Sequence, residues 1–397
     1  MPFSVISANW PLLLGMGVLM LGAGLQSTLL GLRATMEGFP TVVTGIVMSC
    51  YYVGYLLGTF IAPPSLSRVG HIRVFAALAA IASVAILVQG MLVHPLVWGA
   101  MRLVSGVCFA GIYVVSESWL NDRATRENRG RLFAVYMLIL YIGLGAAQFL
   151  LIASDPLTPT PFMLVGVLIS LAMVPIVVSA QRLPEHAIPL KVRLRDLYSN
   201  SPLGIVAVAF SGLISSIIFS MGPVYARLAG LSTKDVATFM AISILAAVIT
   251  QYPVGRLSDR IDRRTVIALI CTLATIVAGT MVALPEMPRG AFLLLTALFS
   301  GFALTLYSLS VSHVNDKLEP AQMVAASSAL LLLNGTAAAM GPVLAGSLMT
   351  AFGPHAYFAT LAGLTGSLAV YDLWRKSRRR PVPPSQKGPF VGAQPRM

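Results

Sequence analysis

Long apolar runs are the feature that most constrains how this chain can fold. They recur along all 397 residues and are separated by short polar segments. A run of about 20 apolar residues crosses about 30 Å of hydrocarbon as an α-helix. Unpaired backbone groups are costly in lipid, and the polar/apolar alternation of a β-barrel is absent. The sequence therefore predicts an all-α membrane protein with twelve spans, at roughly 10–31, 40–62, 74–93, 96–119, 132–153, 161–180, 203–226, 236–255, 265–284, 290–313, 324–349 and 354–374.

The composition excludes several classes of function. Hydrophobic residues make up 57% of the chain and charged residues only 10%, although the net charge is +13. In soluble domains about a quarter of the residues are charged. A chain with so few charges has no polar surface on which to bind nucleic acid. The three cysteines lie far apart within apolar runs, which indicates neither a disulfide framework nor a thiolate metal site. We expect no metal, no cofactor and no nucleic-acid partner.

The distribution of basic residues predicts the orientation in the membrane. Of the 27 lysines and arginines, 22 fall in segments on one side of the twelve spans. Basic loops remain on the cytoplasmic side of a membrane. Both termini are therefore expected in the cytoplasm, in a membrane of the bacterial inner-membrane type.

Two matches within the chain indicate an internal duplication. A polar connection at 181–201 separates two groups of six spans, 1–180 and 202–374, and a basic, proline-rich tail follows at 375–397. Arg68 corresponds to Arg260 at an offset of 192. At an offset of 194, the ends of the fourth and tenth spans share five residues: Tyr113, Ser116, Ser118, Asn121 and Asp122 match Tyr307, Ser310, Ser312, Asn315 and Asp316. Duplicated halves are typical of secondary transporters.

The loop after the eighth span resembles a family signature. Residues 255–264 read GRLSDRIDRR, which is similar to the G-x-L-x-D-R-x-G-R-R loop of the major facilitator superfamily, with Asp262 in place of glycine. Its first-half counterpart, at 63–71, keeps Arg68 and Gly70 but lacks the acidic residue. In the fourth span, Arg102, Gly106 and Ala110 resemble the R-x-x-x-G-x-x-x-A signature of proton-coupled members. The glycine-rich antiporter signature of the fifth span is not evident.

The block at 117–122, ESWLND, followed by Arg129, Gly130 and Arg131, resembles the YcaD-like branch of that superfamily. The resemblance implies twelve helices in two pseudo-symmetric six-helix bundles. It also implies a secondary transporter that works by alternating access.

Charged residues within spans are candidates for coupling transport to an ion gradient. On insertion scales a charge at the centre of a span costs about 2.5–3.5 kcal/mol, so such residues are commonly functional. Arg102 is the only cation within a span, and Glu117 is an anion near the inner end of the same span. Arg102 could bind an anionic substrate, lower the pKa of a nearby acid, or only pack and reach toward the interface. Glu117 could carry the coupling proton or pair with a loop arginine.

The charges at the cytoplasmic ends predict a gate. Asp122 and Asp316 end spans four and ten at equivalent positions, close to the loops that carry basic residues. We expect them, together with Asp259 facing a helix N-terminus, to hold the cytoplasmic side shut. Rim pairs of this kind are worth about 1 kcal/mol each. The predicted gate comprises Arg68, Asp122, Asp259, Arg260, Arg263, Arg264 and Asp316.

Neutral polar and aromatic residues within spans are candidates for substrate contact. Each could instead make only a hydrogen bond between helices, worth about 0.6 kcal/mol. A cavity with so few charges predicts a neutral, amphipathic or singly charged substrate. The candidates are Gln26, Tyr52, Tyr55, Tyr113, Gln148, Ser215, Gln251, Tyr307 and Asn334.

The predicted function is secondary transport of a small organic solute, a metabolite or drug-like molecule, coupled to protons. No nucleotide-binding loop is present and the loops are too short for an enzymatic domain, so we expect no enzyme. The alternatives are an uncoupled uniporter, a copper importer using Met16 and Met20, or a transport-dead receptor or scaffold acting through the tail. We expect a monomer in the lipid bilayer.

Overall fold

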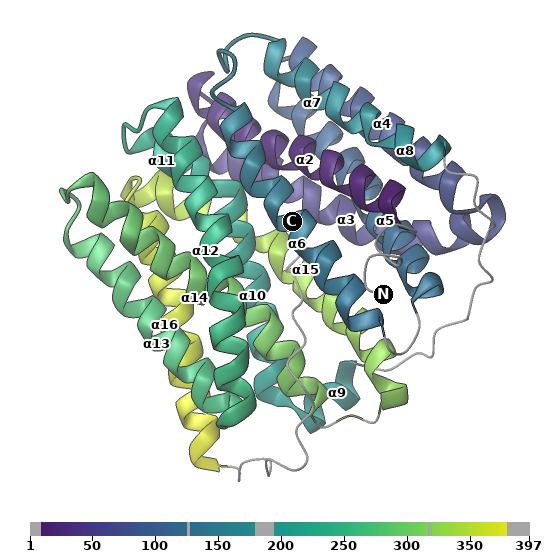
Figure 1. Cartoon of the computed structure of the whole chain (residues 1–397). Helices are drawn as coiled ribbons and strands as arrows, with labels where there is room; N and C mark the ends of the chain where they lie inside the picture. Colours follow the sequence, from purple (N-terminus) through teal and green to yellow (C-terminus); the bar gives the residue numbers. More distant parts are fainter. Residues whose placement is uncertain (1–8, 125–127, 179–193, 317, 319, 379–397) are drawn as a thin grey trace. The chain divides into compact units, whose positions relative to one another are not determined.

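The computed structural model describes residues 9–124, 128–178, 194–316, 318 and 320–378. Within these residues the chain is helical and its helices are joined by short turns (Figure 1). The elements are α2 (Trp10–Met36), α3 (Thr41–Val69), α4 (His71–Met91), α5 (Pro95–Arg123), α6 (Arg129–Leu150), α7 (Thr160–Leu171), α8 (Met173–Val178), α9 (Leu194–Asn200), α10 (Pro202–Ser216), the π-helix η1 (Ile217–Met221), α11 (Gly222–Leu228), α12 (Thr233–Arg260), α13 (Arg263–Ala283), α14 (Arg289–Asn315), α15 (Pro320–Phe352) and α16 (Ala356–Arg378).

Eleven helical segments of the described chain are long and apolar enough to cross a membrane. Two of them combine neighbouring elements: α7 with α8, and α10 with η1 and α11. This confirms the prediction of an all-α chain with membrane-length helices. The twelfth predicted span coincides with α16, which contains Asp372 and is not among the eleven. The count of twelve and the cytoplasmic termini stay predictions.

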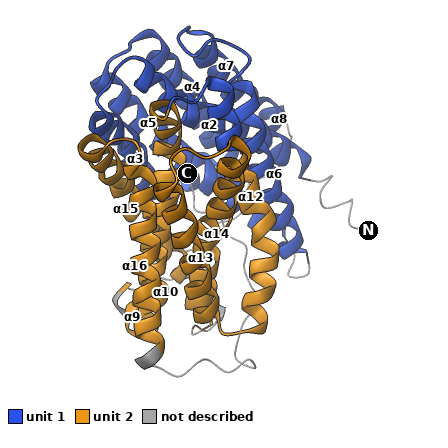
Figure 2. Cartoon of the chain, turned by 90° about the vertical axis from the view of Figure 1, so that its left-hand side faces the viewer, with its two compact units in different colours: residues 1–187, 230–241 blue, residues 188–229, 242–397 orange. Residues whose placement is uncertain are grey.

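The chain divides into two compact units (Figure 2). Unit 1 comprises Met1–Ala187 and Gly230–Ala241, and unit 2 comprises Ile188–Ala229 and Ile242–Met397. In unit 1 the main helix pairs are α3 with α5, α2 with α6, and α4 with α5. In unit 2 they are α13 with α16, α10 with α15, and α13 with α14. Most of the predicted linker, 181–201, lies outside the described residues, so that boundary stays a prediction.

Two glycines allow α3 and α5 to pack backbone against backbone. A Cβ atom at Gly106 would collide with the carbonyl oxygen of Tyr51, and one at Gly54 with that of Leu103. Small residues permit this close approach between membrane helices. Because Gly106 lies one turn after Arg102, the same packing holds the Arg102 side chain against α3.

A single glycine sets the turn between α3 and α4. Gly70 has a φ of 89°, in the left-handed region that favours glycine. Its backbone N–H bonds to the carbonyl oxygen of Leu66 and so ends α3. The chain then enters α4 at His71, which is buried, whereas Arg68 on the last turn of α3 is exposed.

Candidate functional site

Arg102 is a buried cation on the first third of α5. Its side chain has only 4% of its surface exposed, and its guanidinium carbon lies 4.4 Å from the centre of the Tyr51 ring. A cation over an aromatic face is attracted by the ring quadrupole. Among the described residues, its Nε has no hydrogen-bond partner. The groups that interact with it electrostatically are Tyr51, Tyr52 and Cys50.

Three predicted substrate contacts belong to a cluster of aromatic rings beside Arg102. The ring of Tyr51 lies 5.5 Å from Tyr52, 6.3 Å from Tyr55 and 6.2 Å from Phe109. Tyr55 in turn lies 6.3 Å from Tyr113. We call these five residues the aromatic cluster; they come from α3 and α5 and all are buried.

The two predicted glutamines of unit 1 differ in their surroundings. Gln148 on α6 accepts a hydrogen bond from Thr28 Oγ1 at 2.6 Å and donates to the carbonyl oxygens of Gly24 and Leu144. It therefore joins α6 to α2, and its polar atoms are used. Gln26 on α2 has 1% of its surface exposed, and its Nε2 has no hydrogen-bond partner among the described residues.

Two of the four predicted substrate contacts of unit 2 connect helices by hydrogen bonds. The Asn334 side chain on α15 donates to Ser211 Oγ and to the carbonyl oxygen of Val208 on α10, each at 3.1 Å. Gln251 on α12 donates to Ser308 on α14 at 3.3 Å. Ser215 donates to its own helix, and Tyr307 packs in a buried apolar cluster with Val208, Val311 and Leu330.

At the α12–α13 turn of unit 2, one arginine holds two carboxylates. The two terminal nitrogens of Arg263 lie 3.1 Å from Asp259 and 3.1 Å from Asp316. The Arg263 and Asp316 side chains are 1% and 2% exposed, whereas Asp259 is 43% exposed. The predicted neighbours Asp316 and Arg263 are therefore in contact, as a buried pair and not as a wet rim pair.

The residues on either side of Arg263 form a second ion pair. Asp262 accepts a hydrogen bond from the backbone N–H of Arg264 and caps α13, and its carboxylate lies 2.8 Å from the Arg264 guanidinium. Burial raises the pKa of Asp262. The hydrogen bonds and charge of Arg264, with a contribution from the charge of His313, lower it by more than burial raises it, so the pKa lies below its usual value. Arg260 is exposed and makes no ion pair within the described chain.

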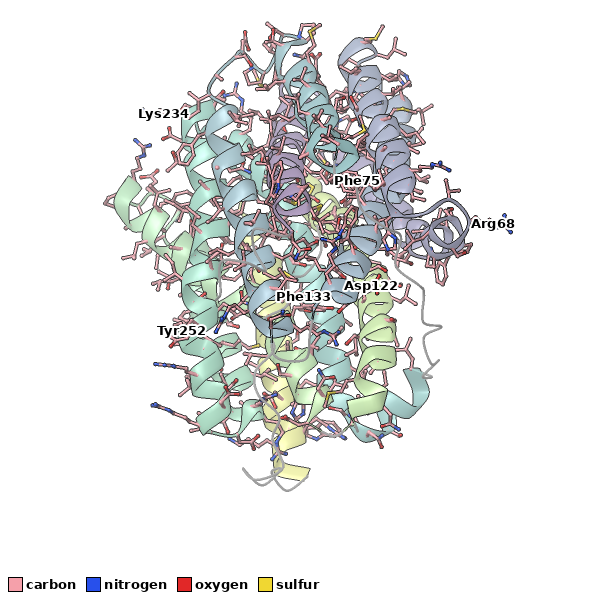
Figure 3. All side chains as sticks on the ribbon, turned by 45° about the vertical axis from the view of Figure 1, so that its right-hand side comes forward. Arg68, Phe75, Asp122, Phe133, Lys234 and Tyr252 are labelled. Atoms are coloured by element: carbon pink, nitrogen blue, oxygen red, sulfur yellow. The ribbon has the colours of Figure 1, made fainter. Side chains whose placement is uncertain are left out.

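The equivalent corner of unit 1 uses a histidine. His71 Nε2 lies 3.1 Å from Ser118 Oγ and 3.9 Å from Asp122 Oδ2. Its ring also meets Trp119 edge-on at 6.1 Å. Arg68 points outward, away from Asp122 (Figure 3). The expected pair between Arg68 and Asp122 is not formed. The chain turns at Gly70, so His71, and not Arg68, points toward α5.

Sequence reasoning missed one residue in each unit, His71 in unit 1 and Asp372 in unit 2. His71 is the counterpart of Arg263 at the offset of 192 that relates Arg68 to Arg260, so the repeat could have revealed it. Asp372 on α16 is fully buried, and neither of its carboxylate oxygens has a hydrogen-bond partner among the described residues. It interacts electrostatically with Arg264, Asp262 and Lys376. Asp372 lies within the predicted span 354–374, two residues before its end, and a charged residue at that place could have identified it in the sequence.

The remaining predicted positions have simpler environments. Glu117 is half-buried on α5. The thioethers proposed for copper both accept hydrogen bonds from α5: Met20 from Tyr113 at 3.3 Å and Met16 from Ser116 at 3.1 Å. The described residues contain no cluster of His, Cys, Asp and Glu able to hold a metal ion.

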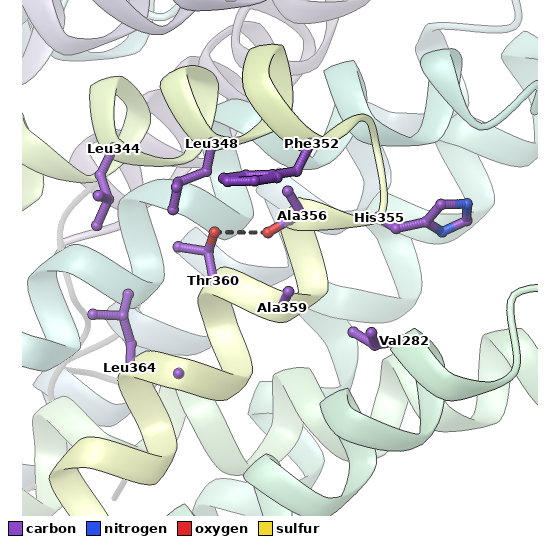
Figure 4. A pocket seen from close by; sticks show the side chains of 10 residues that line it. Val282, Leu344, Leu348, Phe352, His355, Ala356, Ala359, Thr360 and Leu364 are labelled. Carbon is purple, nitrogen blue, oxygen red and sulfur yellow. Dashed lines mark hydrogen bonds between the residues drawn. The ribbon is translucent and has the colours of Figure 1, made fainter.

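A pocket of about 520 Å³ lies in unit 2 among α13, α15 and α16 (Figure 4). Its walls are mainly apolar, and the hydroxyl of Thr360 donates within its own helix, to Ala356. Phe352 at its edge is 76% exposed. None of the predicted site residues lines it, and it offers no cation.

Comparison with known proteins assigns the chain to a family. The sequence profile of the Major Facilitator Superfamily matches residues 12–330 and 239–396. An uncharacterized MFS-type transporter of Enterobacter sp. (strain 638) is 28% identical over 349 residues, 87% of this chain and 90% of its own length. The uncharacterized MFS-type transporter YcaD of Escherichia coli O139:H28 is 28% identical over 353 residues, with the same coverage. Both the superfamily and the YcaD-like resemblance are confirmed.

Solved structures with the same fold support this result. A mutant of the nucleoside transporter NupG superposes with a TM-score of 0.80 at 14% identity, covering 93% of this chain and 99% of NupG. A bacterial homologue of the lysosomal transporter Spinster gives 0.73 at 14% identity, with 95% of each chain covered. The human organic anion transporter MFSD10 gives 0.60 at 15% identity, covering 91% and 98%.

Proposed function

The chain belongs to the major facilitator superfamily, and on that premise we propose that it moves a small organic solute across a bacterial inner membrane by alternating access, driven by the proton gradient. The observation that carries the proposal is the match of the superfamily profile along nearly the whole chain, whose described residues contain eleven membrane-length helices. Structures of similar fold are named for nucleosides and for organic anions, so the fold does not select a substrate.

We propose α16 as the twelfth span, which brings the N- and C-termini to the same, cytoplasmic side. The excess of basic residues in the predicted inner segments supports this orientation. A reporter that is active only in the cytoplasm, fused to either terminus, should be active. A reporter inserted at the turn between α15 and α16, at Gly353, should be silent, and the reverse result would overturn the topology.

For coupling, we propose Arg102 and Glu117 on α5. The supporting observation is that both are ionisable residues on one membrane helix, where charge is costly. In proteoliposomes, uptake of a solute found by a thermal-shift screen of metabolites and drugs should rise with an imposed pH gradient. It should fall when a protonophore is added. The Glu117→Gln variant should exchange solute but lose the response to the pH gradient.

The matched control for coupling is Glu286→Gln, which removes an acid from an exposed loop. Its response to the pH gradient should equal that of the wild type. Transport that ignores both the gradient and the protonophore would exclude proton coupling and favour uniport. Failure of every solute in the screen, together with a cellular phenotype that requires residues 381–397, would favour a receptor or scaffold.

We further propose that the charge clusters around Asp122 and Asp316 stabilise the closed cytoplasmic gate. The support is the buried Arg263–Asp316 pair, because a few kcal/mol are enough to bias a two-state equilibrium. In an Asp316→Arg variant, a cysteine at the buried position 312 (Ser312→Cys) should react faster with a thiol reagent applied from the cytoplasmic side. Uptake should fall. Unchanged labelling together with unchanged uptake would exclude the gate.

A further inference from the structure

No described residue of unit 1 neutralises the charge of Arg102. Its contacts are the Tyr51 ring and the dipoles of neighbouring tyrosines and Cys50, none of which carries a full negative charge at neutral pH. Within the described chain its Nε also lacks a hydrogen-bond acceptor. Burying a cation without a counter-ion is unfavourable, so a residue in this state is commonly completed by a ligand.

The acids of unit 1 that the structure describes are engaged elsewhere or too distant to pair with Arg102. Glu37 pairs with Arg33 at 2.6 Å, and Asp122 lies at the far end of α5 beside His71. Glu117 follows Arg102 by 15 residues on the same helix, about 22 Å along the axis at about 1.5 Å per residue. Asp155 accepts a hydrogen bond in an exposed turn, and Asp235 accepts one in the first turn of α12.

One more buried polar group without a partner lies close to Arg102. Ser105, on the next turn of α5, has no hydrogen-bond partner for its Oγ among the described residues. Gln26 does not belong to this group, because Gly22, one turn before it on the same face of α2, packs against Ile169 of α7. Arg102 Nε and Ser105 Oγ therefore both lack partners on neighbouring turns of α5 within the described chain.

We propose that Arg102 and Ser105, with the aromatic cluster beside them, form a binding site for a small organic monoanion whose carboxylate is attached to a flat apolar body. This inference rests on the proposed transport function and names its substrate class. A guanidinium donates two parallel hydrogen bonds to one carboxylate, and aromatic faces pack against a planar ring.

The charge count favours a monoanion over a phosphate ester or a dicarboxylate. Arg102 is the only cation in this part of the described unit, since Arg33 is paired with Glu37 and donates to the carbonyl oxygen of Pro156. A second negative charge would be left without a counter-ion among tyrosine and phenylalanine rings. Neutral molecules of the same shape would leave the Arg102 charge uncompensated.

The test compares matched anionic and neutral probes on the purified full-length protein in detergent. The probes are benzoate and 4-hydroxybenzoate, with benzamide and 4-hydroxybenzamide as neutral analogues of the same shape. We expect the two carboxylates to raise the thermal unfolding midpoint and to bind at least tenfold more tightly than the amides. Equal effects of carboxylates and amides would overturn the inference.

Three variants separate a binding role from a structural one. Arg102→Gln should abolish the effect of the carboxylates, and without ligand it should unfold at the same or a higher temperature than the wild type, because it removes an uncompensated charge. Arg102→Lys should retain weakened binding. Arg256→Gln is the matched control, because Arg256 also lies over a tyrosine ring, at 4.5 Å from Tyr252, but is exposed. It should bind like the wild type.

The outcomes distinguish this inference from the proposed function. An Arg102→Gln protein that melts well below the wild type while the wild type ignores carboxylates would show a structural arginine. Proton-driven transport of a neutral solute that survives Arg102→Gln would leave the proposed function standing and overturn the monoanion site. Carboxylate binding that requires Arg102, without transport of any probe, would support the site and contradict the transport proposal.

Discussion

The corner where α4 meets α5 in unit 1 and the corner where α13 meets α14 in unit 2 occupy equivalent positions of the internal repeat, but their chemistry differs. In unit 1, His71 lies 3.9 Å from Asp122, whose side chain is 29% exposed. In unit 2, Arg263 lies 3.1 Å from Asp316, whose side chain is 2% exposed. Arginine is charged at every physiological pH, whereas the charge of a histidine changes near neutrality.

This difference shows that the repeat retains geometry more faithfully than charge. Both corners place the first residue of one helix against the last turn of the next. Only unit 2 adds Asp259 as a second acid on the same cation and Asp262 as a helix cap. Gly70, the counterpart of Asp262, has no side chain with which to cap α4. We therefore expect the unit 2 corner to be the more rigid of the two.

The largest expected loss of stability comes from removing the buried cation Arg263. Arg263→Gln leaves the Asp316 carboxylate buried without its counter-ion, and breaking such a pair costs about 3–5 kcal/mol. His71→Gln should lower the free energy of unfolding far less. Glutamine can still hydrogen-bond to Ser118, and the contact with the Asp122 carboxylate that it loses spans 3.9 Å. Thermal unfolding in detergent, followed by the reaction of the buried Cys108 and Cys271 with a thiol dye, measures both. Equal losses of stability would remove the distinction between the two corners.

The helices themselves could be predicted from the sequence because membrane spans require long apolar runs. The helix ends could not, since α3 continues past the predicted end of its span to Val69 before Gly70 stops it. The Arg263–Asp316 contact followed from the loop signature and the repeat. The His71–Asp122 contact did not, because the signature directed attention to Arg68 and only the turn at Gly70 decides which basic side chain points inward.

The candidate substrate residues were predictable as a set but not individually. Gln148, Gln251 and Asn334 look alike in the sequence, yet each hydrogen-bonds to a neighbouring helix, while Gln26 retains a buried donor without a partner among the described residues. Sequence shows that a residue is polar and lies in a span. It does not show the rotation of the helix about its axis, which determines what each polar atom meets. The same limit applies to Arg102, whose uncompensated charge became visible only when its neighbours were known.

A smaller effect is expected from the cap that unit 2 has and unit 1 lacks. Asp262→Ala removes the N-cap of α13, a loss of about 1 kcal/mol. The pKa of Asp262 is lowered in the folded protein, so its contribution to stability is fully present above the ordinary pKa of an aspartate. It is lost as the pH falls through the lowered value. The wild type should therefore lose more stability on acidification than Asp262→Ala, as measured by unfolding midpoints from pH 6 to pH 3.

The Asp262→Asn variant separates the cap from the charge. Asparagine caps helices about as well as aspartate, so at neutral pH this variant should be more stable than Asp262→Ala but less stable than the wild type, because it lacks the charge that pairs with Arg264. Its loss of stability in acid should match that of Asp262→Ala, because neither side chain titrates. If Asp262→Asn followed the wild type in acid, the pH dependence would come from another group.

The smallest effect should come from the exposed acid of the unit 1 corner. Asp122→Asn removes a partly solvated charge whose separation from His71 is at the limit of an ion pair, and exposed pairs are worth about 0.2–1 kcal/mol. Asp316→Asn is the matched change in unit 2. It removes the buried carboxylate from Arg263 and keeps the half-exposed Asp259, and should cost several times more. Unfolding midpoints of the two variants, measured side by side at neutral pH, give the ratio directly. A larger loss for Asp122→Asn would mean that the histidine corner contributes more to the free energy of unfolding than the arginine corner does.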